Sequence, residues 1–250
     1  MGKSEEIERP IVVKALHKSF GDQTVLNGID LAVEGGETLT ILGRSGTGKS
    51  VLLKLIIGLQ EPDSGSIQIQ GKEITGLALD ELNEVRKKVG FLFQYAALYD
   101  SLTVGENVAF PLKRHAALSA AELKGRVHEL LSSVGMEQDL DKMPAKISGG
   151  MQKRVGLARA LALDPDVLLF DEPTAGLDPI TAREIGELIL SLQEQRKRAC
   201  IVVTHDIPNA KTISDRLALM QGGNILAEGT FKDLQHSPNE FVTRFLMNAS

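Results

Sequence analysis

The stretch Gly43-Arg44-Ser45-Gly46-Thr47-Gly48-Lys49-Ser50 fits the pattern G-x-x-x-x-G-K-[ST] at every fixed position. An apolar segment with β-branched residues, 37–42, precedes it, and a second apolar segment, 51–59, follows it. This order predicts a strand, a glycine-rich loop and a buried helix. Glycines let backbone N–H groups close around a phosphate, and the first turn of a helix offers unpaired donors to the same anion. A phosphate-binding loop is therefore predicted at 43–50, although a glycine-rich turn with an exposed lysine would share the pattern.

Two side chains of this loop indicate that the ligand is a nucleotide with Mg²⁺. Lys49 is placed to reach the β- and γ-phosphates of a nucleotide, and the Ser50 hydroxyl to bind Mg²⁺. A second motif supports them, because the four apolar residues 167–170 are followed by Asp171 and Glu172. Both acids are then expected at the end of a buried strand, Asp171 as a direct or indirect ligand of Mg²⁺ and Glu172 as the base for an attacking water. The alternative is a helix cap or a solvated pair of acids before Pro173.

The composition indicates a globular protein with a sizeable core. The chain has 250 residues, of which 42% are hydrophobic and 24% charged, and we expect one domain with subdivisions. A net charge of −5 argues against a protein that holds a polyanion by its overall field, so no nucleic-acid partner is expected. The apolar runs are too short to cross a bilayer, which predicts a cytoplasmic chain unless a partner holds it at a membrane. The single cysteine, Cys200, is expected in the core.

The order of predicted elements gives an α/β fold. Strands at 11–19, 24–33 and 66–70 would form an N-terminal antiparallel β layer. From 95 to about 163 the period becomes helical, with candidates at 104–113, 120–134 and 149–161, which predicts a helical subdomain inserted into a single domain of residues 1–250. Strands and helices then alternate from 167 onward. Such alternation predicts a mainly parallel core sheet, with the nucleotide at the carboxyl ends of its strands.

The order of the motifs resembles that of ATP-binding cassette (ABC) ATPases, which are P-loop NTPases, over essentially the whole chain. The positions that carry the match, besides the phosphate loop and the acid pair, are Phe20, Gln94, Ser148-Gly149-Gly150, Leu177-Asp178 and His205. The resemblance implies ATP and Mg²⁺ as ligands and ATP hydrolysis as the activity. Phe20 would stack on adenine, Gln94 would sense Mg²⁺ and water, and His205 would contact the γ-phosphate and the attacking water. On residue type alone, Phe20 and His205 could instead be core residues.

The resemblance also implies a homodimer. Ser148 before two glycines opens a predicted helix and offers a hydroxyl and free N–H groups, so residues 148–150 form a second anion site or simply an N-terminal cap. In the family this site binds the γ-phosphate held by the phosphate loop of the other subunit, and the loop with Asp178 contacts the dimer partner. The sequence departs from the family pattern at Met151, where the usual residue is Gln, so position 151 receives no role.

A narrower resemblance rests on 93–104, 106–112 and Met151, which are similar to bacterial ATPases of the Mla/Mce lipid-transport group. It implies two membrane permease subunits, a partner with an MCE domain, lipid or phospholipid transport, and a place at the cytoplasmic face of the inner membrane. The ATPase of another ABC importer and a single-cassette assembly factor are the alternatives. In the family, the loop after Gln94 meets a cytoplasmic helix of the permease. We expect 95–102 to be exposed, with Leu98 as an anchor, unless Leu98 and Tyr99 pack under the helices that follow.

Overall fold

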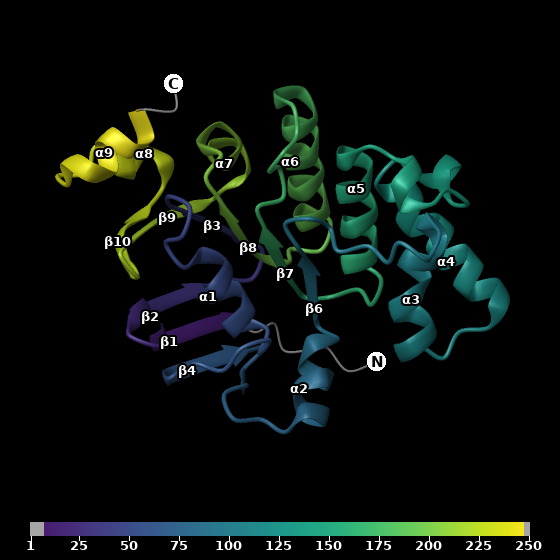
Figure 1. Ribbon diagram of the computed structural model, residues 1–250, viewed down its shortest axis with the longest axis horizontal. Coiled ribbons are helices and arrows are strands. Elements are labelled where there is room, and N and C mark those ends of the chain that lie inside the picture. The colour runs from purple at the N-terminus through teal and green to yellow at the C-terminus, as the bar shows by residue number, and fades with distance from the viewer. Residues whose placement is uncertain (1–7, 248–250) are drawn as a thin grey trace.

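Two β-sheets form the frame of the chain in the computed structural model, which describes residues 8–247; the first seven and last three residues of the predicted domain lie outside that range (Figure 1). The smaller sheet has the order β2-β1-β4-β5 and is antiparallel. The larger has the order β10-β9-β3-β8-β7-β6, parallel throughout except for β10. The strands are β1 (Ile11–Phe20), β2 (Gln23–Val33), β3 (Thr38–Leu42), β4 (Ser64–Ile69), β5 (Lys72–Glu73), β6 (Val89–Leu92), β7 (Val167–Asp171), β8 (Ala199–Thr204), β9 (Arg216–Gln221) and β10 (Asn224–Gly229).

The helices lie on both sides of the larger sheet (Figure 1). They are α1 (Lys49–Ile56), α2 (Leu79–Arg86), α3 (Val104–His115), α4 (Ala120–Ser133), α5 (Gly149–Ala160), α6 (Pro179–Glu194), α7 (Ile207–Ile213), α8 (Phe231–Gln235) and α9 (Glu240–Met247). Two of the three helices from the predicted helical region start at a capping box, Thr103 with Glu106 on α3 and Ser119 with Glu122 on α4, which satisfies N–H groups that have no partner within the helix. Within residues 8–247, no helix combines the length and apolar character that a bilayer span needs.

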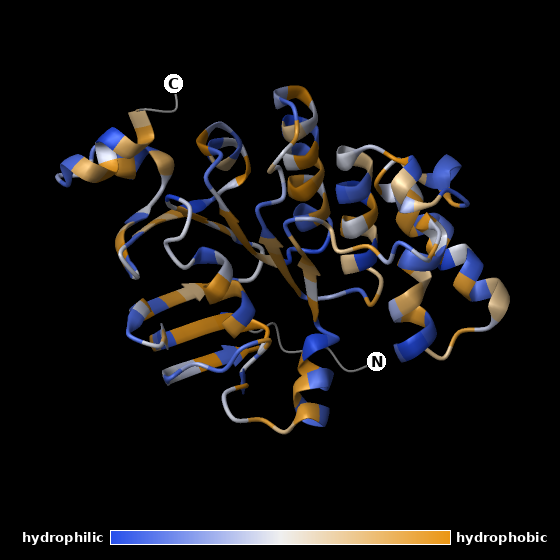
Figure 2. Cartoon of the chain, in the orientation of Figure 1, coloured by the Kyte–Doolittle hydropathy of each residue, from blue (hydrophilic) through white to orange (hydrophobic). Residues whose placement is uncertain are grey.

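The four strands β3, β6, β7 and β8 of the larger sheet are buried at every position, on both faces, because most of their residues are apolar. On β8, Ile201 and Val203 pack in one cluster with α1 and the antiparallel sheet, whereas Cys200 and Val202 pack in a second cluster with α5 and α6. A third cluster joins the C-terminal helices to β9. Figure 2 shows these central strands as the most hydrophobic part of the fold. The parallel sheet is thus held rigidly, and its carboxyl ends form one fixed edge.

The α/β fold predicted from the sequence is confirmed, with its antiparallel layer, mainly parallel sheet and helical subdomain. Cys200 is buried, as expected. Differences lie at short elements. β5 and the two 3₁₀ turns, Glu137–Asp139 and Pro144–Lys146, were not expected, because two or three residues carry no period. β6 ends at Leu92, so Phe93 and Gln94 belong to the loop that follows this strand.

Candidate nucleotide site

The loop 43–50 joins β3 to α1 and owes its shape to its glycines. Gly46 and Gly48 have φ angles of +79° and +99°, in the left-handed region that residues with a Cβ rarely adopt. Gly43 is required by space, since a Cβ there would lie 2.6 Å from the carbonyl oxygen of Met220 on β9. The loop and the first turn of α1 line one side of a cavity of about 980 Å³. A triphosphate chain fits this cradle, because backbone N–H groups and a helix N-terminus face it.

Lys49 is the first residue of α1, and its side chain is buried. The ammonium group donates to the carbonyl oxygens of Gly43 at 2.8 Å and Arg44 at 3.1 Å, and lies 3.8 Å from Glu172 Oε1. Burial lowers the pKa of Lys49, and the carboxylates of Glu172 and Asp171 act in the opposite direction. A cation that has lost most of its water and holds only two neutral carbonyls closely is well placed to bind phosphate oxygens.

Ser50 and Asp171 meet across the gap between α1 and the end of β7. The Ser50 hydroxyl donates to Asp171 Oδ1 at 2.7 Å. Burial raises the pKa of Asp171, while the hydrogen bond from Ser50 opposes the rise. Hydroxyl, carboxylate and amide oxygens suit Mg²⁺, which prefers hard oxygen ligands, so Ser50, Asp171 and Gln94 are the residues that could hold this ion.

Glu172 follows directly and has a φ of +47°, unusual for a residue with a side chain. Its carboxylate is buried, and Oε2 accepts a hydrogen bond from the Thr204 hydroxyl at 3.2 Å. Nδ1 of His205 lies 2.9 Å from the same oxygen. β7 and β8 are parallel neighbours, so their ends bring Glu172 and His205 together. The acids are therefore not a solvated pair, and Glu172 is a fixed carboxylate facing the cavity.

The remaining predicted contacts of the nucleotide also reach this cavity. Gln94 lies two residues beyond the end of β6 and lines it, together with His205. Phe20 ends β1 and is 48% exposed, so the core alternative is wrong for this residue, and its ring lines the cavity as well. Among the residues of the phosphate loop, Ser45 lines the cavity, whereas the Thr47 hydroxyl turns back onto the carbonyl of Arg44 at 2.9 Å.

The predicted second anion site does not lie in this cavity. Ser148 caps α5 by accepting a hydrogen bond from the Met151 N–H at 3.2 Å, so the capping role is real whatever else the residue does. Gly149 and Gly150 lie beside the loop that leads to α6, where a Cβ on Gly150 would be 2.5 Å from Thr181. Asp178 caps α6. The hydrogen bonds that its carboxylate accepts lower its pKa, and the bond from the Thr181 hydroxyl has the largest effect. These residues form a separate group at the start of α5 and α6.

Two predictions about neighbouring positions need correction or completion. Leu98 is half-buried and packs against the core of helices α3–α5, so the expectation of an exposed anchor is wrong for this residue. The exposed aromatic side chains of the loop are Tyr95, which is 83% exposed, and Tyr99, whose ring centroid lies 4.8 Å from that of Phe110. Met151 packs against the same helical core rather than facing the anion site.

Sequence reasoning missed a buried cation beside the acids. Lys153 on α5 is 4% exposed, and its ammonium donates to the carbonyl oxygens of Gln94 and, at 3.0 Å, of Glu172. Burial lowers the pKa of Lys153 to about 8, opposed by Asp171 and Glu172. The signal was available in the spacing. Lys153 shares a helix face with Gly150 and Gly156. Small residues let this face pack closely against neighbouring elements, so a lysine on it is buried and needs polar partners inside the protein.

Comparison with known proteins agrees with this geometry. The family model described as "ABC transporter" matches residues 26–175. A probable ribonucleotide transport ATP-binding protein of Mycobacterium leprae is 41% identical over 94% of this chain and 68% of its own length. A methionine import ATP-binding protein, MetN, of Rhizobium johnstonii is 41% identical over 98% of this chain and 66% of its own. The chain thus spans about two thirds of these relatives. Neither name mentions lipids, so the narrower resemblance to lipid-transport ATPases gains no support from them.

Solved structures give the same result. The dimeric post-hydrolysis state of the ATP-binding cassette MJ0796, bound to ADP and Pi, matches with a TM-score of 0.82 and 35% identity, covering 88% of this chain and 98% of that one. CbiO1 from Clostridium perfringens, part of the transporter complex CbiONQ, matches with a TM-score of 0.84 and 31% identity over 92% of both chains. With a phosphate loop, a buried acid pair and a histidine arranged around one cavity, the chain belongs to the ABC transporter family and is an ATP-hydrolysing, Mg²⁺-dependent cassette of it.

Proposed function

We propose that this cassette powers a membrane permease by cycles of ATP binding and hydrolysis at the cavity described above. Lys49 binds the β- and γ-phosphates, and the phosphate-loop residues 43–50 enclose them with N–H groups. Ser50, Asp171 and Gln94 would hold Mg²⁺, and the ion would supply positive charge to neutralise the phosphates. Glu172 accepts a proton from the attacking water. His205, with Nδ1 beside the Glu172 carboxylate, holds that carboxylate toward the water.

We also propose that two copies of the chain share each ATP. The support is the separation, within one chain, of the Ser148 group from the phosphate loop. Ser148, Gly149, Gly150 and Asp178 lie at the start of two helices and do not line the ATP cavity. A second copy would bring this group to the open side of the cavity, where the Ser148 hydroxyl and the N–H groups of α5 meet the γ-phosphate.

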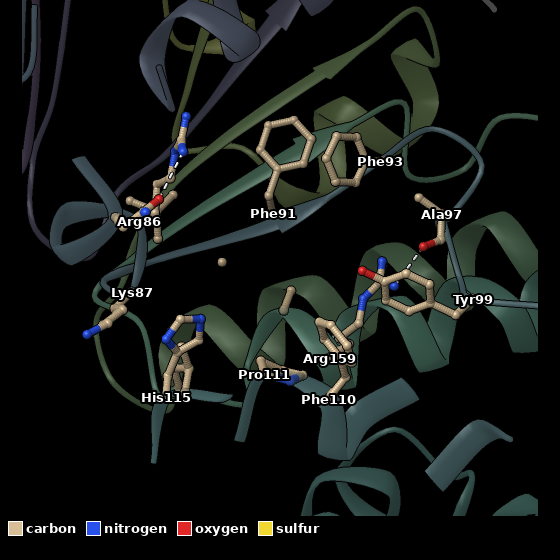
Figure 3. A pocket seen from close by; sticks show the side chains of 15 residues that line it. Arg86, Lys87, Phe91, Phe93, Ala97, Tyr99, Phe110, Pro111, His115 and Arg159 are labelled. Carbon is tan, nitrogen blue, oxygen red and sulfur yellow. Dashed lines mark hydrogen bonds between the residues drawn. The ribbon is translucent and has the colours of Figure 1, made fainter. Parts of the chain in front are cut away.

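The observation that supports the transport role is a groove beside the segment that contains Gln94; Phe93 and Ala97 line this groove. Its volume is about 500 Å³, and it runs between β6 with α2 on one side and α3 with α5 on the other (Figure 3). Figure 3 shows two aromatic pairs in it, Phe91 with Phe93 and Tyr99 with Phe110, at centroid distances of 4.3 Å and 4.8 Å. Tyr99 and Phe110 are exposed, and exposed aromatic side chains in a concave surface fit a helical protein segment. A short cytoplasmic helix of the permease is the proposed occupant.

With this docking, the proposed location of the protein is the cytoplasmic face of the inner membrane, where two permease subunits would bind it. The docking is tested by purifying the protein with its partners in detergent. Phe110→Ala should reduce recovery of the permease more than tenfold, since an aromatic anchor of an interface contributes about 2 kcal/mol or more. Leu226→Ala on β10 is the matched control, because the two side chains are 36% and 38% exposed and only Phe110 lines the groove. Equal recovery of the permease by both variants would exclude the groove as the docking site.

The proposed cargo is a lipid or phospholipid, moved with a partner that carries an MCE domain. The support is the similarity of 93–104, 106–112 and Met151 to lipid-transport ATPases. The names of the relatives favour a second candidate, import of methionine or transport of a ribonucleotide. Mass spectrometry of the purified complex distinguishes the two. Co-purified phospholipid and an MCE-domain subunit support lipid transport, whereas a substrate-binding protein and ATPase activity stimulated by methionine or a ribonucleotide would replace it. Recovery of only soluble partners would indicate an assembly factor.

A further inference from the structure

Helix α5 carries two cationic side chains that hold backbone carbonyls of the ATP site and of the groove. Lys153 donates to the carbonyls of Gln94 and Glu172. Arg159, one and a half turns further along, donates to the carbonyl of Ala97 at 2.7 Å and to that of Ala96 at 2.5 Å. Figure 3 shows the Arg159 side chain pointing into the loop at Ala97. Together they bind three carbonyls of the segment 94–97 from one rigid helix.

The carbonyls that these cations hold belong largely to backbone in an unfavourable conformation. Ala96, Ala97 and Glu172 have φ angles of +57°, +48° and +47°. Residues with a side chain rarely adopt this conformation, and it persists only where the surrounding contacts fix it. Glu172 is fixed on its amide side by a hydrogen bond to the Val203 carbonyl at 2.9 Å. On its carbonyl side, the partner is Lys153.

Close packing of α5 makes this contact possible. A Cβ on Gly156 would lie 2.6 Å from Leu92 on β6 and 3.3 Å from Ala96, so the absence of a side chain lets the helix approach the strand end. Lys153 lies one turn before Gly156 and reaches the space between β6 and β7. The same helix begins at Ser148, in the group proposed to meet the ATP of a second copy.

From this geometry we propose that Lys153 is a positioning residue for hydrolysis: it fixes the Gln94 and Glu172 backbones relative to each other and to α5. The inference rests on the role proposed for Glu172. Through Lys153, α5 connects two places: its Ser148 end, which is proposed to face the second copy, and the base Glu172 in its own chain. Lys153 does not line the ATP cavity; it acts by positioning the Glu172 carboxylate and the Gln94 amide, whose backbone carbonyls it holds.

The test compares Lys153→Met and Lys153→Gln with Arg159→Met, which removes a half-buried cation from the same helix without touching Gln94 or Glu172. Lys153→Met should lower kcat about 100-fold, the cost of a misplacement of about 1 Å at a reacting group, with the KM for ATP unchanged within threefold. Lys153→Gln keeps a donor for one carbonyl and should give an intermediate kcat. Arg159→Met should leave kcat within threefold of the wild type. A wild-type kcat in either folded Lys153 variant, or an equal loss in Arg159→Met, overturns the proposal.

Amide hydrogen exchange of the ATP-free protein supplies a readout that is independent of turnover. In both Lys153 variants, exchange should become several-fold faster in two peptides, one covering 93–97 and one covering 171–175; in Arg159→Met it should rise only in the first. Unchanged exchange at 171–175 in Lys153→Met would overturn the proposal. Glu172→Gln is assayed in parallel. If it retains full turnover, the role of Glu172 itself is wrong, whereas an inactive Glu172→Gln beside a fully active Lys153→Met refutes only the inference about Lys153.

Discussion

Gly156→Ala and Gly125→Ala are the same substitution in two helices, and we expect them to change stability in opposite directions. Gly125 is exposed on α4, and a Cβ there meets nothing within 4 Å. Alanine should stabilise the folded state at this position by about 0.5–1 kcal/mol, because glycine loses more backbone entropy in a helix. Gly156 gains the same backbone term, but its Cβ would lie 2.6 Å from Leu92, which is fully buried, and 3.3 Å from Ala96.

Forcing an extra carbon into a filled core costs about 1–3 kcal/mol, which exceeds the gain in helix propensity. The net effect of Gly156→Ala is then a loss of about 1 kcal/mol, or about 2–4 °C in Tm for a chain of this size. Calorimetry and urea unfolding without nucleotide measure both variants. Gly156→Ala should also lower ATPase activity, because displacement of α5 moves Lys153. If Gly156→Ala raises the Tm as much as Gly125→Ala does, the contact of α5 with β6 is looser than the structure shows, and the reasoning is refuted.

Three other substitutions test the site and its surroundings. Glu172→Gln keeps the size of the side chain but removes the base, so phosphate release should fall about 10²–10⁴-fold while binding of a fluorescent ATP analogue persists; near wild-type turnover would remove Glu172 from this role. A Lys49→Ala chain mixed with a Ser148→Arg chain should regain activity that neither homodimer has, because one of the two shared sites is then intact; full activity of either homodimer would contradict sharing. Leu98→Asp should lower the unfolding midpoint by several degrees, since it places a charge against the helical core, and an unchanged midpoint would instead return Leu98 to the surface.

The parts of the site that could be predicted are those in which a few adjacent residues fix the local chemistry. The glycines, Lys49 and Ser50 determine a phosphate loop within eight positions, and an apolar run that ends in two acids determines a strand end. The α/β fold followed from alternating strands and helices. Each of these signals is local, so tertiary contacts did not need to be known.

The parts that could not be predicted depend on contacts between distant segments. Leu98 looks like a surface anchor in sequence, and only the packing of α3–α5 shows that it is half-buried. Lys153 looks like an ordinary helix lysine until the carbonyls of Gln94 and Glu172, 59 and 19 residues away, are seen beside it. The left-handed conformation of Glu172 has no sequence signal, because glutamate does not favour it.

The reactivity of Cys200 reports on opening of the central sheet. Its thiol is fully buried on β8, which pairs with β3 on one side and β7 on the other, and burial raises its pKa to about 12. A thiolate is the reactive form, so a reagent such as an iodoacetamide can modify this residue only after the sheet opens. Because it is the one cysteine of the chain, the labelling rate of the native protein measures that opening. In Tyr95→Cys, the exposed new thiol would for the same reason be the only readily labelled one, which gives a dye position next to Gln94 without replacing the native Cys200.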